Sequence, residues 1–445
     1  FLSDNVDILL SARKQLPSIR TAVDFTSSGL DDSTASLLKI SGDTNRARAK
    51  IAVLPANLQK RPFVAHLQRL LVTVWAQSDA RTAEQAAQVL TTGVNGVIAS
   101  DSTLFADVLR KLPANTLLRK PLVIGHRGMP AGTENDENTL ESAKAAVAAG
   151  ADAVENDIYI TTDGHLVIMH DTTVDRTTNG TGTIESMSLE QVKALRTKGQ
   201  GLQVPTMREY FQAFKDKPIT HFIEIKSSTP AVVTQLKKEM AEEGVAEQSI
   251  AISFDTNQMK LSTTEIPELA LGFLGGGADS GTVLNDVRTV LNATQSYNST
   301  YNPSYANIKR ATMEAAKHRG TTFWPWTIDS AADFYKLYSW GTHGLTTNYA
   351  KHATNFPVEI ATAALPTKIA LNEATSLNVN LTTQIGQVST VAANEMVVLG
   401  GTAQAEAPSN GTVKFTSAGT AVVMPGYRYK MGDGTYSFVL MSKPV

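Results

Sequence analysis

Short hydrophobic runs alternate with helix-like stretches between about residues 121 and 348. The stretches 141–149 and 231–243 have the spacing of apolar residues that is typical of helices. We expect strands at Leu122–Ile124, Ala153–Val154, Leu166–Met169, Phe222–Ile223, Ile250–Ile252, Ala270–Phe273, Thr322–Trp324 and Gly344–Thr346. Eight strands with helices between them predict an α/β protein with a (β/α)₈ barrel, the TIM-barrel fold.

The pattern changes after Ala364. Helical periodicity fades, and short runs such as 377–381, 412–415 and 436–440 alternate between hydrophobic and polar residues. Turn formers, for example Pro425-Gly426, separate these runs. We therefore expect residues 366–445 to form an all-β accessory domain, a small antiparallel sandwich of the Ig-like type.

Part of the N-terminal region is weakly similar in sequence to part of the predicted barrel. An aromatic run at 72–75 is followed by Gly93-x-x-Gly96, as the run 323–326 is followed by Gly341-x-x-Gly344. One interpretation is that residues 1–116 are a partial barrel-like α/β region, the second half of another barrel, next to a complete barrel at 117–360. The alternative is a generic α/β segment whose similarity arose by chance. Either way, this region lacks counterparts of the polar motifs described below.

Composition narrows the class of protein. The 445 residues are 42% hydrophobic and 18% charged, which is ordinary for a packed globular protein. A formal net charge of −2 gives no basic field for nucleic acid. The absence of cysteine excludes disulfides, thiolate metal ligands and cysteine nucleophiles. No apolar run approaches the roughly 18 residues of a transmembrane helix.

Charged residues gather at the ends of the predicted strands. Side chains alternate along a strand, so Glu155 and Asp157 share one face, as do Glu224 and Lys226. Barrel enzymes build their sites at the carboxyl ends of the strands. An isolated Glu-x-Asp is usually a solvated strand end and a lone histidine is usually structural, but several such segments on successive strands argue for a site. The set is His126, Glu155, Asp157, His170, Glu224 and Lys226.

These residue types indicate a metal and a phosphate. Converging carboxylates repel one another unless a cation neutralises them, and all-oxygen ligation favours Mg²⁺ or Ca²⁺. Arg127 and Lys226 supply positive charge suited to a phosphate. The two histidines can act as general base and general acid near neutral pH. Gly125 and Gly128 are expected to let the backbone approach a ligand.

A family resemblance rests on these motifs. The chain resembles the glycerophosphodiester phosphodiesterase family over about residues 121–350. The similar segments are Gly125-His126-Arg127-Gly128, Glu137-Asn138-Thr139, Glu155-Asn156-Asp157, Thr162-Asp163-Gly164, His170-Asp171, Arg176–Gly180, Pro205-Thr206, Glu224-Ile225-Lys226, Ser253-Phe254, Trp326-Thr327 and Gly341–Asn348. The resemblance implies a TIM barrel that hydrolyses glycerophosphodiesters to glycerol 3-phosphate and an alcohol.

The same resemblance implies roles for individual residues. It implies a divalent cation, Ca²⁺ or Mg²⁺, on Glu155, Asp157 and Glu224; acid and base roles for His126 and His170; phosphate contacts from Arg127 and Lys226; and support for the metal site from Glu137. Of Trp324 and Trp326 on the seventh predicted strand, one is a candidate to line the substrate pocket, with Trp326 as the supporting residue, and the alternative is a buried core aromatic. The resemblance also implies attack by the substrate's own glycerol hydroxyl, followed by opening of a cyclic phosphate by water. Which histidine is the acid stays open. Asp136 stands where the family often has proline, which puts substrate preference in doubt.

Two other functions remain open: phospholipase-D-like cyclisation of lysolipids on the same barrel, and an inactive surface binding or scaffold protein. The appended β region and the lack of cysteine favour an extracellular or cell-surface location in a bacterium. A chain that begins at Phe1 is expected to be a mature or trimmed form. We expect small glycerophosphodiesters, or a glycerol-phosphate wall polymer, as substrates, and self-association through the N-terminal region.

Overall fold

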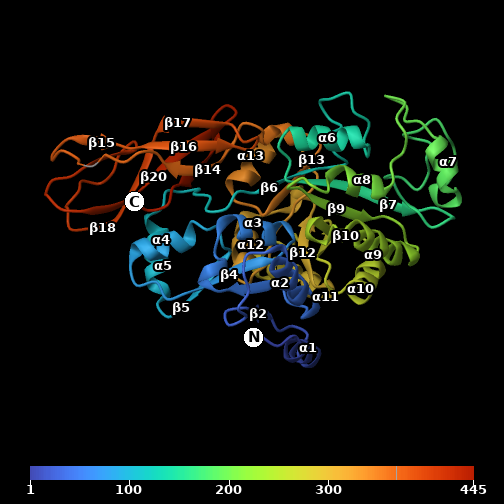
Figure 1. Cartoon of the computed structure of the whole chain (residues 1–445), viewed down its shortest axis with the longest axis horizontal. Helices are drawn as coiled ribbons and strands as arrows, with labels where there is room; N and C mark the ends of the chain where they lie inside the picture. The colour runs from blue at the N-terminus through green and yellow to red at the C-terminus, as the bar shows by residue number, and fades with distance from the viewer. Residues whose placement is uncertain (367) are drawn as a thin grey trace.

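A parallel β-barrel forms the centre of the computed structural model, which describes residues 1–366 and 368–445. In Figure 1 the green and yellow barrel lies at the right, the blue N-terminal region below it and the orange to red C-terminal sheets at the upper left. The parallel strands, in spatial order, are β12 (Ser299–Pro303), β11 (Leu271–Gly275), β10 (Ser249–Ser253), β9 (Thr220–Ile225), β7 (Ala153–Ile160), β6 (Leu122–Gly125) and β13 (Gly344–Thr347).

The segment 322–328 closes this sheet. On one side, the backbone N–H of Trp324 donates to the carbonyl of Tyr301 at 2.9 Å. On the other side, the N–H of His343 donates to the carbonyl of Phe323 at 3.0 Å. Isolated parallel bridges join the same segment to β12 and to Ser304 directly after it. Eight parallel segments therefore surround one core, and the predicted TIM-barrel-like fold is confirmed.

One predicted barrel strand is wrong and one was missed. The run Leu166–Met169 forms β8 (Leu166–Ile168), which pairs antiparallel with the end of β7 and belongs to an excursion over residues 161–206 with its own small core. The eighth barrel strand is instead β12, which lies between β11 and the segment 322–328, and its sequence Ser-Thr-Tyr-Asn-Pro contains no apolar run. Hydrophobicity alone could not find a buried strand made of polar residues.

Helices follow the barrel strands and bury one face each. In α8, Met207, Tyr210, Phe211 and Phe214 recur at helical spacing and are all buried, and a capping box at Thr206 starts the helix. The predicted helices 141–149 and 231–243 are present as α6 and α9. The helices are α6 (Leu140–Ala148), α7 (Leu189–Ala194, in the excursion), α8 (Met207–Phe214), α9 (Ala231–Glu243), α10 (Thr256–Glu265), α11 (Val283–Tyr297), α12 (Arg310–Lys317) and α13 (Ala331–Ser339).

The N-terminal region is an open, sequentially ordered parallel sheet beneath the barrel. Its strands are β1 (Leu2–Ser3), β2 (Ala22–Asp24), β3 (Ile51–Leu54), β4 (Thr73–Ser78) and β5 (Gly96–Ala99). Its helices are α1 (Val6–Gln15), α2 (Thr34–Arg46), α3 (Arg61–Arg69), α4 (Ala83–Leu90) and α5 (Ser102–Lys111). Arg69 donates to the carbonyl of Pro218, and Thr73 to that of Gly320. Both carbonyls lie in loops that precede barrel strands, so the region covers the end of the barrel opposite the strand carboxyl ends.

The C-terminal residues form separate antiparallel sheets. The strands are β14 (Pro357–Thr362), β16 (Asn378–Thr383) and β17 (Val388–Ala392); β15 (Ala374–Ser376) and β19 (Thr412–Lys414); and β18 (Glu395–Gly401), β20 (Ala421–Met431) and β21 (Tyr436–Met441). From β21, Phe438 packs on Tyr338 of α13 with 5.2 Å between ring centroids. Its neighbour Val439 packs with α4 and α5 and bonds to Leu117 of the connecting segment. The sheet thus contacts both the barrel and the N-terminal region.

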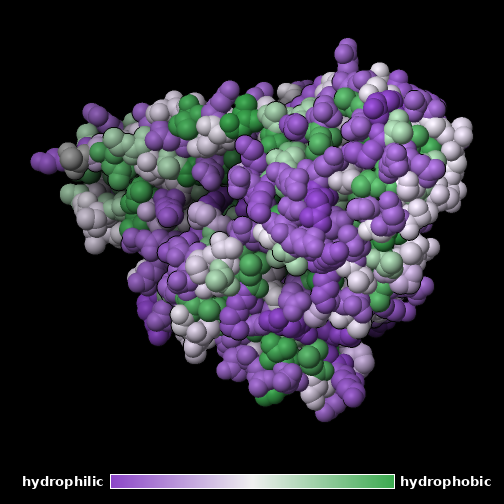
Figure 2. Space-filling view, turned by 45° about the vertical axis from the view of Figure 1, so that its right-hand side comes forward, coloured by the Kyte–Doolittle hydropathy of each residue, from purple (hydrophilic) through white to green (hydrophobic). Residues whose placement is uncertain are grey.

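Within the described residues, no helix has the length and apolar character needed to cross a membrane. Hydrophilic residues cover most of the face drawn in Figure 2, and hydrophobic residues occur there in small groups. Such scattered apolar side chains are usual on a protein surface.

Candidate active site

Three carboxylates meet at the carboxyl ends of β7 and β9. Asp157 is the register partner of Glu224 on the neighbouring strand, and Glu155 lies two residues earlier on the same face of β7. One oxygen from each of the three lies within 4.8 Å of the others. Their exposed fractions are 1% for Glu155, 0% for Asp157 and 7% for Glu224. The strand pairing therefore brings together the carboxylates that the sequence placed far apart.

This group is electrostatically unfavourable as it stands. Burial, together with the charges of its two neighbours, raises the pKa of Glu155 well above its ordinary value. Burial and the nearby Glu224 raise the pKa of Asp157 to about 6, and burial also raises the pKa of Glu224. Among the described residues, Oε1 of Glu155 and Oδ1 of Asp157 have no hydrogen-bond donor. Buried, unpaired oxygens of this kind fit a hard divalent cation.

The turn after β6 packs tightly against α6. Gly128 has φ of +86°, and a Cβ on this residue would lie 2.5 Å from Ser142. A Cβ on Gly125 would lie 2.5 Å from the carbonyl oxygen of Gly128. Both glycines are explained by close packing of backbone on helix, so the expectation that they make room for a ligand finds no support.

Arg127 lies in this turn with φ of +53° and contacts the carboxylate group. Its backbone N–H donates to Oε2 of Glu155 at 2.8 Å, and its Nε lies 3.6 Å from Oδ2 of Asp157. Its Nη1 donates to Oε1 of Glu137 at 3.0 Å. Glu137 also accepts from Arg176 at 2.6 Å. Glu137 therefore stands outside the three-carboxylate group and holds Arg127 in place.

His126 presents Nε2 to the carboxylates. Its Nδ1 lies 2.8 Å from Oδ1 of Asn348, whose Nδ2 donates to Oδ2 of Asp329 at 2.8 Å. Since Asp329 can only accept, the Asn348 amide must present its oxygen to His126, and Nδ1 carries the proton. Nε2 lies 4.0 Å from Oε2 of Glu155. Burial, followed by the charge of Arg127, lowers the pKa of His126 to about 4, so this imidazole is neutral.

His170 lies across the site and has a charged partner instead. Its Nδ1 is 2.7 Å from Oδ1 of Asp171, and hydrogen bonds from Arg176 and His170 hold the pKa of Asp171 at about 2. Its Nε2 lies 3.3 Å from Nζ of Lys226. Lys226 in turn is 3.0 Å from Oε1 of Glu224. The two histidines thus differ in the partner of Nδ1, which is the amide of Asn348 for His126 and the carboxylate of Asp171 for His170.

The two tryptophans of the segment 322–328 occupy different surroundings. Trp324 is 2% exposed and packs on Phe222 in the barrel core. Trp326 is partly buried and donates from Nε1 to the carbonyl of Asn302 at 2.8 Å. Its ring meets that of Phe254 edge to face at 5.2 Å, and Phe254 is 46% exposed. Trp326 and Phe254 therefore form an apolar edge past the ends of the strands that carry them.

Sequence reasoning missed the pair Asn348–Asp329 and the role of Arg176. Arg176 and Asn348 lie within segments that carry the family resemblance, but Asp329 belongs to no motif. Its part in the site depends on the hydrogen bonds that it accepts from the side chain and backbone of Asn348 at 2.8 and 3.0 Å. Only the fold brings these groups behind His126.

Comparisons with known proteins address the same region. A family model described as the glycerophosphoryl diester phosphodiesterase family matches residues 126–352, which include every candidate site residue. A glycerophosphodiester phosphodiesterase from Caldanaerobacter subterraneus subsp. tengcongensis is 34% identical over 238 residues, covering 52% of this chain and 94% of that protein. Another from Bacillus subtilis (strain 168) is 28% identical and covers 51% of this chain and 83% of the relative.

Solved structures are also similar over the same share of the chain. An Oleispira antarctica phosphodiesterase in complex with the product sn-glycerol-3-phosphate has 23% sequence identity and a TM-score of 0.46. The match covers 52% of this chain and 94% of that one.

Proposed function

Because the chain belongs to the glycerophosphodiester phosphodiesterase family, we propose that its barrel hydrolyses glycerophosphodiesters to glycerol 3-phosphate and an alcohol. The observation that carries this proposal is the buried carboxylate group with one histidine on each side and two cations beside it. All of these residues lie inside the region that matches the family.

A divalent cation would be held by Glu155, Asp157 and Glu224, whose unpaired buried oxygens suit it. We propose Ca²⁺ or Mg²⁺, since the donor set contains only oxygen. When bound, the cation supplies positive charge that stabilises the phosphoryl oxygens during the reaction. Arg127 and Lys226 add fixed positive charge at the same place.

In the first step, we propose that Nε2 of His126 takes the proton of the substrate's glycerol hydroxyl. That oxygen bonds to phosphorus, and the bond from phosphorus to the departing alcohol breaks. His170, in its protonated form, gives its proton to the departing oxygen. The neutral amide of Asn348 suits a base at His126, whereas the Asp171 carboxylate can neutralise an imidazolium at His170.

In the second step, water opens the cyclic phosphate and the histidines exchange roles. His170 takes a proton from the water as its oxygen bonds to phosphorus. His126 returns its proton to the glycerol oxygen as that bond breaks, and glycerol 3-phosphate is released. Both histidines end in their starting forms, so the proton count is balanced.

Lysolipid cyclisation remains a second candidate because Phe254 is 46% exposed beside Trp326. An apolar edge of this kind suits an acyl or alkyl group. This reaction would stop after the first step and leave a cyclic phosphate. Phosphorus NMR of the product separates the candidates: glycerol 3-phosphate supports hydrolysis, and a persistent cyclic phosphate supports cyclisation. The complete set of site residues argues against an inactive scaffold.

The test of the proposed function is release of glycerol 3-phosphate from glycerophosphocholine. We expect release with added Ca²⁺ or Mg²⁺, none in EDTA, and loss in His170→Ala. His318→Ala, an exposed histidine at the end of α12, is the matched control and should retain activity. Failure of the wild-type protein to release product with either cation, from this or any other glycerophosphodiester, would contradict the proposal.

We further propose an organisation into three parts, at 1–116, 117–360 and 366–445. The sequential parallel sheet supports a partial barrel for the first, and the antiparallel sheets support an Ig-like sandwich for the third. Because β14 already pairs with β16, the chain joins the C-terminal sheets before residue 366.

We also propose an extracellular or cell-surface role, with a glycerol-phosphate wall polymer as one substrate and self-association through the N-terminal region. The separate C-terminal sheets and the open N-terminal sheet support these proposals. Hydrolysis of glycerophosphocholine without hydrolysis of the glycerol-phosphate polymer would contradict the proposal that the polymer is a substrate. A monomeric mass in size-exclusion chromatography with light scattering would contradict self-association.

A further inference from the structure

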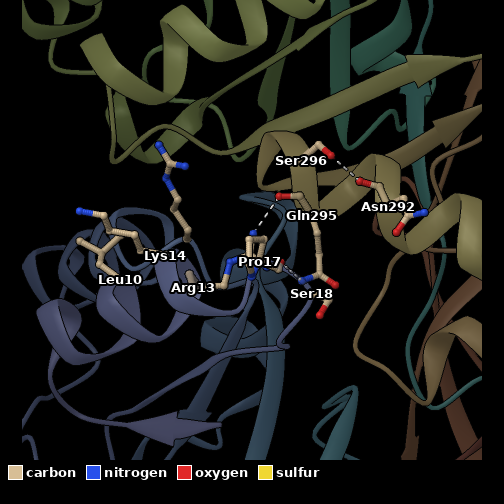
Figure 3. A pocket seen from close by; sticks show the side chains of 9 residues that line it. Leu10, Arg13, Lys14, Pro17, Ser18, Asn292, Gln295 and Ser296 are labelled. Atoms are coloured by element: carbon tan, nitrogen blue, oxygen red, sulfur yellow. Dashed lines mark hydrogen bonds between the residues drawn. The ribbon is translucent and has the colours of Figure 1, made fainter.

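A cavity of about 720 Å³ that is open to solvent lies where the N-terminal region meets the barrel, and most of the side chains that line it are exposed. Figure 3 shows Arg13 and Lys14 of α1 on one side and Asn292 and Ser296 of α11 on the other. These residues of α11 are in its last two turns, just before β12 begins. The cavity is therefore at the end of the barrel opposite the carboxylate group.

The lining contains three cations, Arg13, Lys14 and Arg48, and no carboxylate. Backbone carbonyls nearby are already bound. Arg13 donates to the carbonyls of Pro17 and Gln295 at 2.9 and 2.8 Å, and the Gln295 side chain also donates to Pro17 at 3.0 Å. With these carbonyls bound, the charged groups that face the cavity are donors only, which is the chemistry of an anion site.

Other cations extend this positive group into the protein. Burial and the charge of Arg48 lower the pKa of Arg13, and burial and Arg13 lower that of Arg20 to about 10. Burial and Arg20 lower the pKa of Lys50 to about 7. In each case the charged neighbour is another cation. These cations therefore disfavour one another's charged forms, and an anion bound among them would relieve that repulsion.

Arg48 itself stands where the fold favours glycine. It follows the last turn of α2 with φ of +50°, and its N–H donates to the carbonyl of Asn45 at 2.9 Å. Helices commonly end in this left-handed conformation with glycine, which has no Cβ to crowd the backbone. Its side chain is exposed and lines the cavity, and its guanidinium makes no hydrogen bond or ion pair with the residues that the structure describes. Its position thus leaves a charged fork free for a ligand.

We propose that this cavity binds the phosphate or phosphodiester group of an organic ligand, at a site separate from the catalytic one. Arg48 can pair with two phosphate oxygens at once, with Lys14 as a second charge and the amide of Asn292 as a neutral donor. The volume falls in the range of ligand pockets and exceeds what phosphate alone would fill. This site goes beyond the proposed hydrolysis and does not depend on it.

The test is calorimetric titration of the full chain with glycerol 3-phosphate and with inorganic phosphate. The variant Arg48→Gly with Lys14→Ala removes both free cations, and glycine suits the left-handed backbone, so folding is retained. The control, Lys215→Ala with Lys237→Ala, removes the same charge from exposed positions. We expect two binding sites in the wild type. The affinity of one of them should fall at least about tenfold in the first variant, and neither affinity should change in the control.

Two comparisons make the result specific. Lys226→Ala should weaken the other, catalytic site and leave the cavity site unchanged. The Arg48→Gly/Lys14→Ala variant should hydrolyse glycerophosphodiesters as fast as the wild type. If the wild type binds phosphate in the cavity but neither protein hydrolyses any glycerophosphodiester, only the proposed function is contradicted. Equal phosphate binding by this variant and its control, or a single site abolished by Lys226→Ala, would overturn the proposal.

Vesicle sedimentation identifies the source of the phosphate group. Stronger binding to phosphatidylglycerol than to phosphatidylcholine vesicles, lost in Arg48→Gly/Lys14→Ala, assigns a lipid headgroup. Binding of free glycerol 3-phosphate without vesicle binding assigns a soluble phosphate. Absence of both interactions would overturn the proposal.

Discussion

The Nδ1 atom of His126 lies 2.8 Å from the Oδ1 atom of Asn348. Since the same amide donates to Asp329, its orientation is fixed, and with it the histidine tautomer that turns the free Nε2 toward the carboxylates. A general base needs this orientation before the substrate arrives. The relationship therefore assigns Asn348 a positioning role in the proposed reaction, through His126.

Replacing Asn348 by alanine should lower kcat by about ten- to a hundredfold, because His126 loses the partner that sets its tautomer. KM should change little, since Asn348 acts through the histidine. Steady-state kinetics with glycerophosphocholine measure both constants. Asn285→Ala, at an exposed position of α11, should behave as the wild type. Equal values of kcat for Asn348→Ala and the wild type would contradict the positioning role of Asn348.

Asp157→Asn should stabilise the cation-free protein at pH 7.5. The folded-state pKa of Asp157 is raised from 3.8 to about 6, so ionising this carboxyl disfavours the folded state. The penalty grows as pH rises from about 4 to about 6 and is complete above that range. The gain should reach up to about 3 kcal/mol at pH 7.5 in EDTA and vanish near pH 4. Thermal unfolding at both pH values measures it.

The effect of added Ca²⁺ on thermal stability tests whether Asp157 binds the cation. The cation should raise the melting temperature of the wild type by binding the folded state, and raise that of Asp157→Asn far less. The same rise in both proteins would show that Asp157 does not contact the cation.

Phe438→Ala should destabilise the barrel as well as the C-terminal sheets. This ring is 0% exposed and packs 5.2 Å from Tyr338 and 5.9 Å from Phe356. Its removal should lower the free energy of unfolding by about 3–5 kcal/mol. The temperature at which activity is lost should fall together with the temperature at which the β-sheets unfold. Val388→Ala, at a side chain 67% exposed in β17, should change stability by less than about 0.5 kcal/mol. Activity that survives after the sheets unfold would contradict this coupling.

Local patterns predicted much of the barrel and the site. Alternation placed Glu155 and Asp157 on one face, and parallel pairing then brought Glu224 beside them. The runs at 122–124 and 250–252 lie in barrel strands because their residues are apolar on both faces. β12 was missed because it is buried along its whole length although its residues include the polar Ser299, Thr300 and Asn302.

Other features depend on long-range contacts that no local pattern encodes. Asn348 approaches His126 only because β13 pairs with β6, which joins the two ends of the barrel. Strand β8 has the apolar run of a barrel strand, but it pairs antiparallel with β7. The placement of the C-terminal sheet against both α13 and α4 likewise follows from tertiary packing around Phe438 and Val439.

The most direct test of the account compares two leaving groups in His126→Ala and His170→Ala, with the cation present. An alcohol needs a proton to depart, but p-nitrophenol does not, so the general acid is dispensable for glycerophospho-p-nitrophenol. We predict that His170→Ala loses activity on glycerophosphocholine but, in a single turnover, releases p-nitrophenol from the ester at close to the wild-type rate, because His170 is next needed only when water opens the cyclic phosphate. His126→Ala should be inactive on both. Recovery in His126→Ala, or in neither variant, would contradict the assignment of His126 as base and His170 as acid.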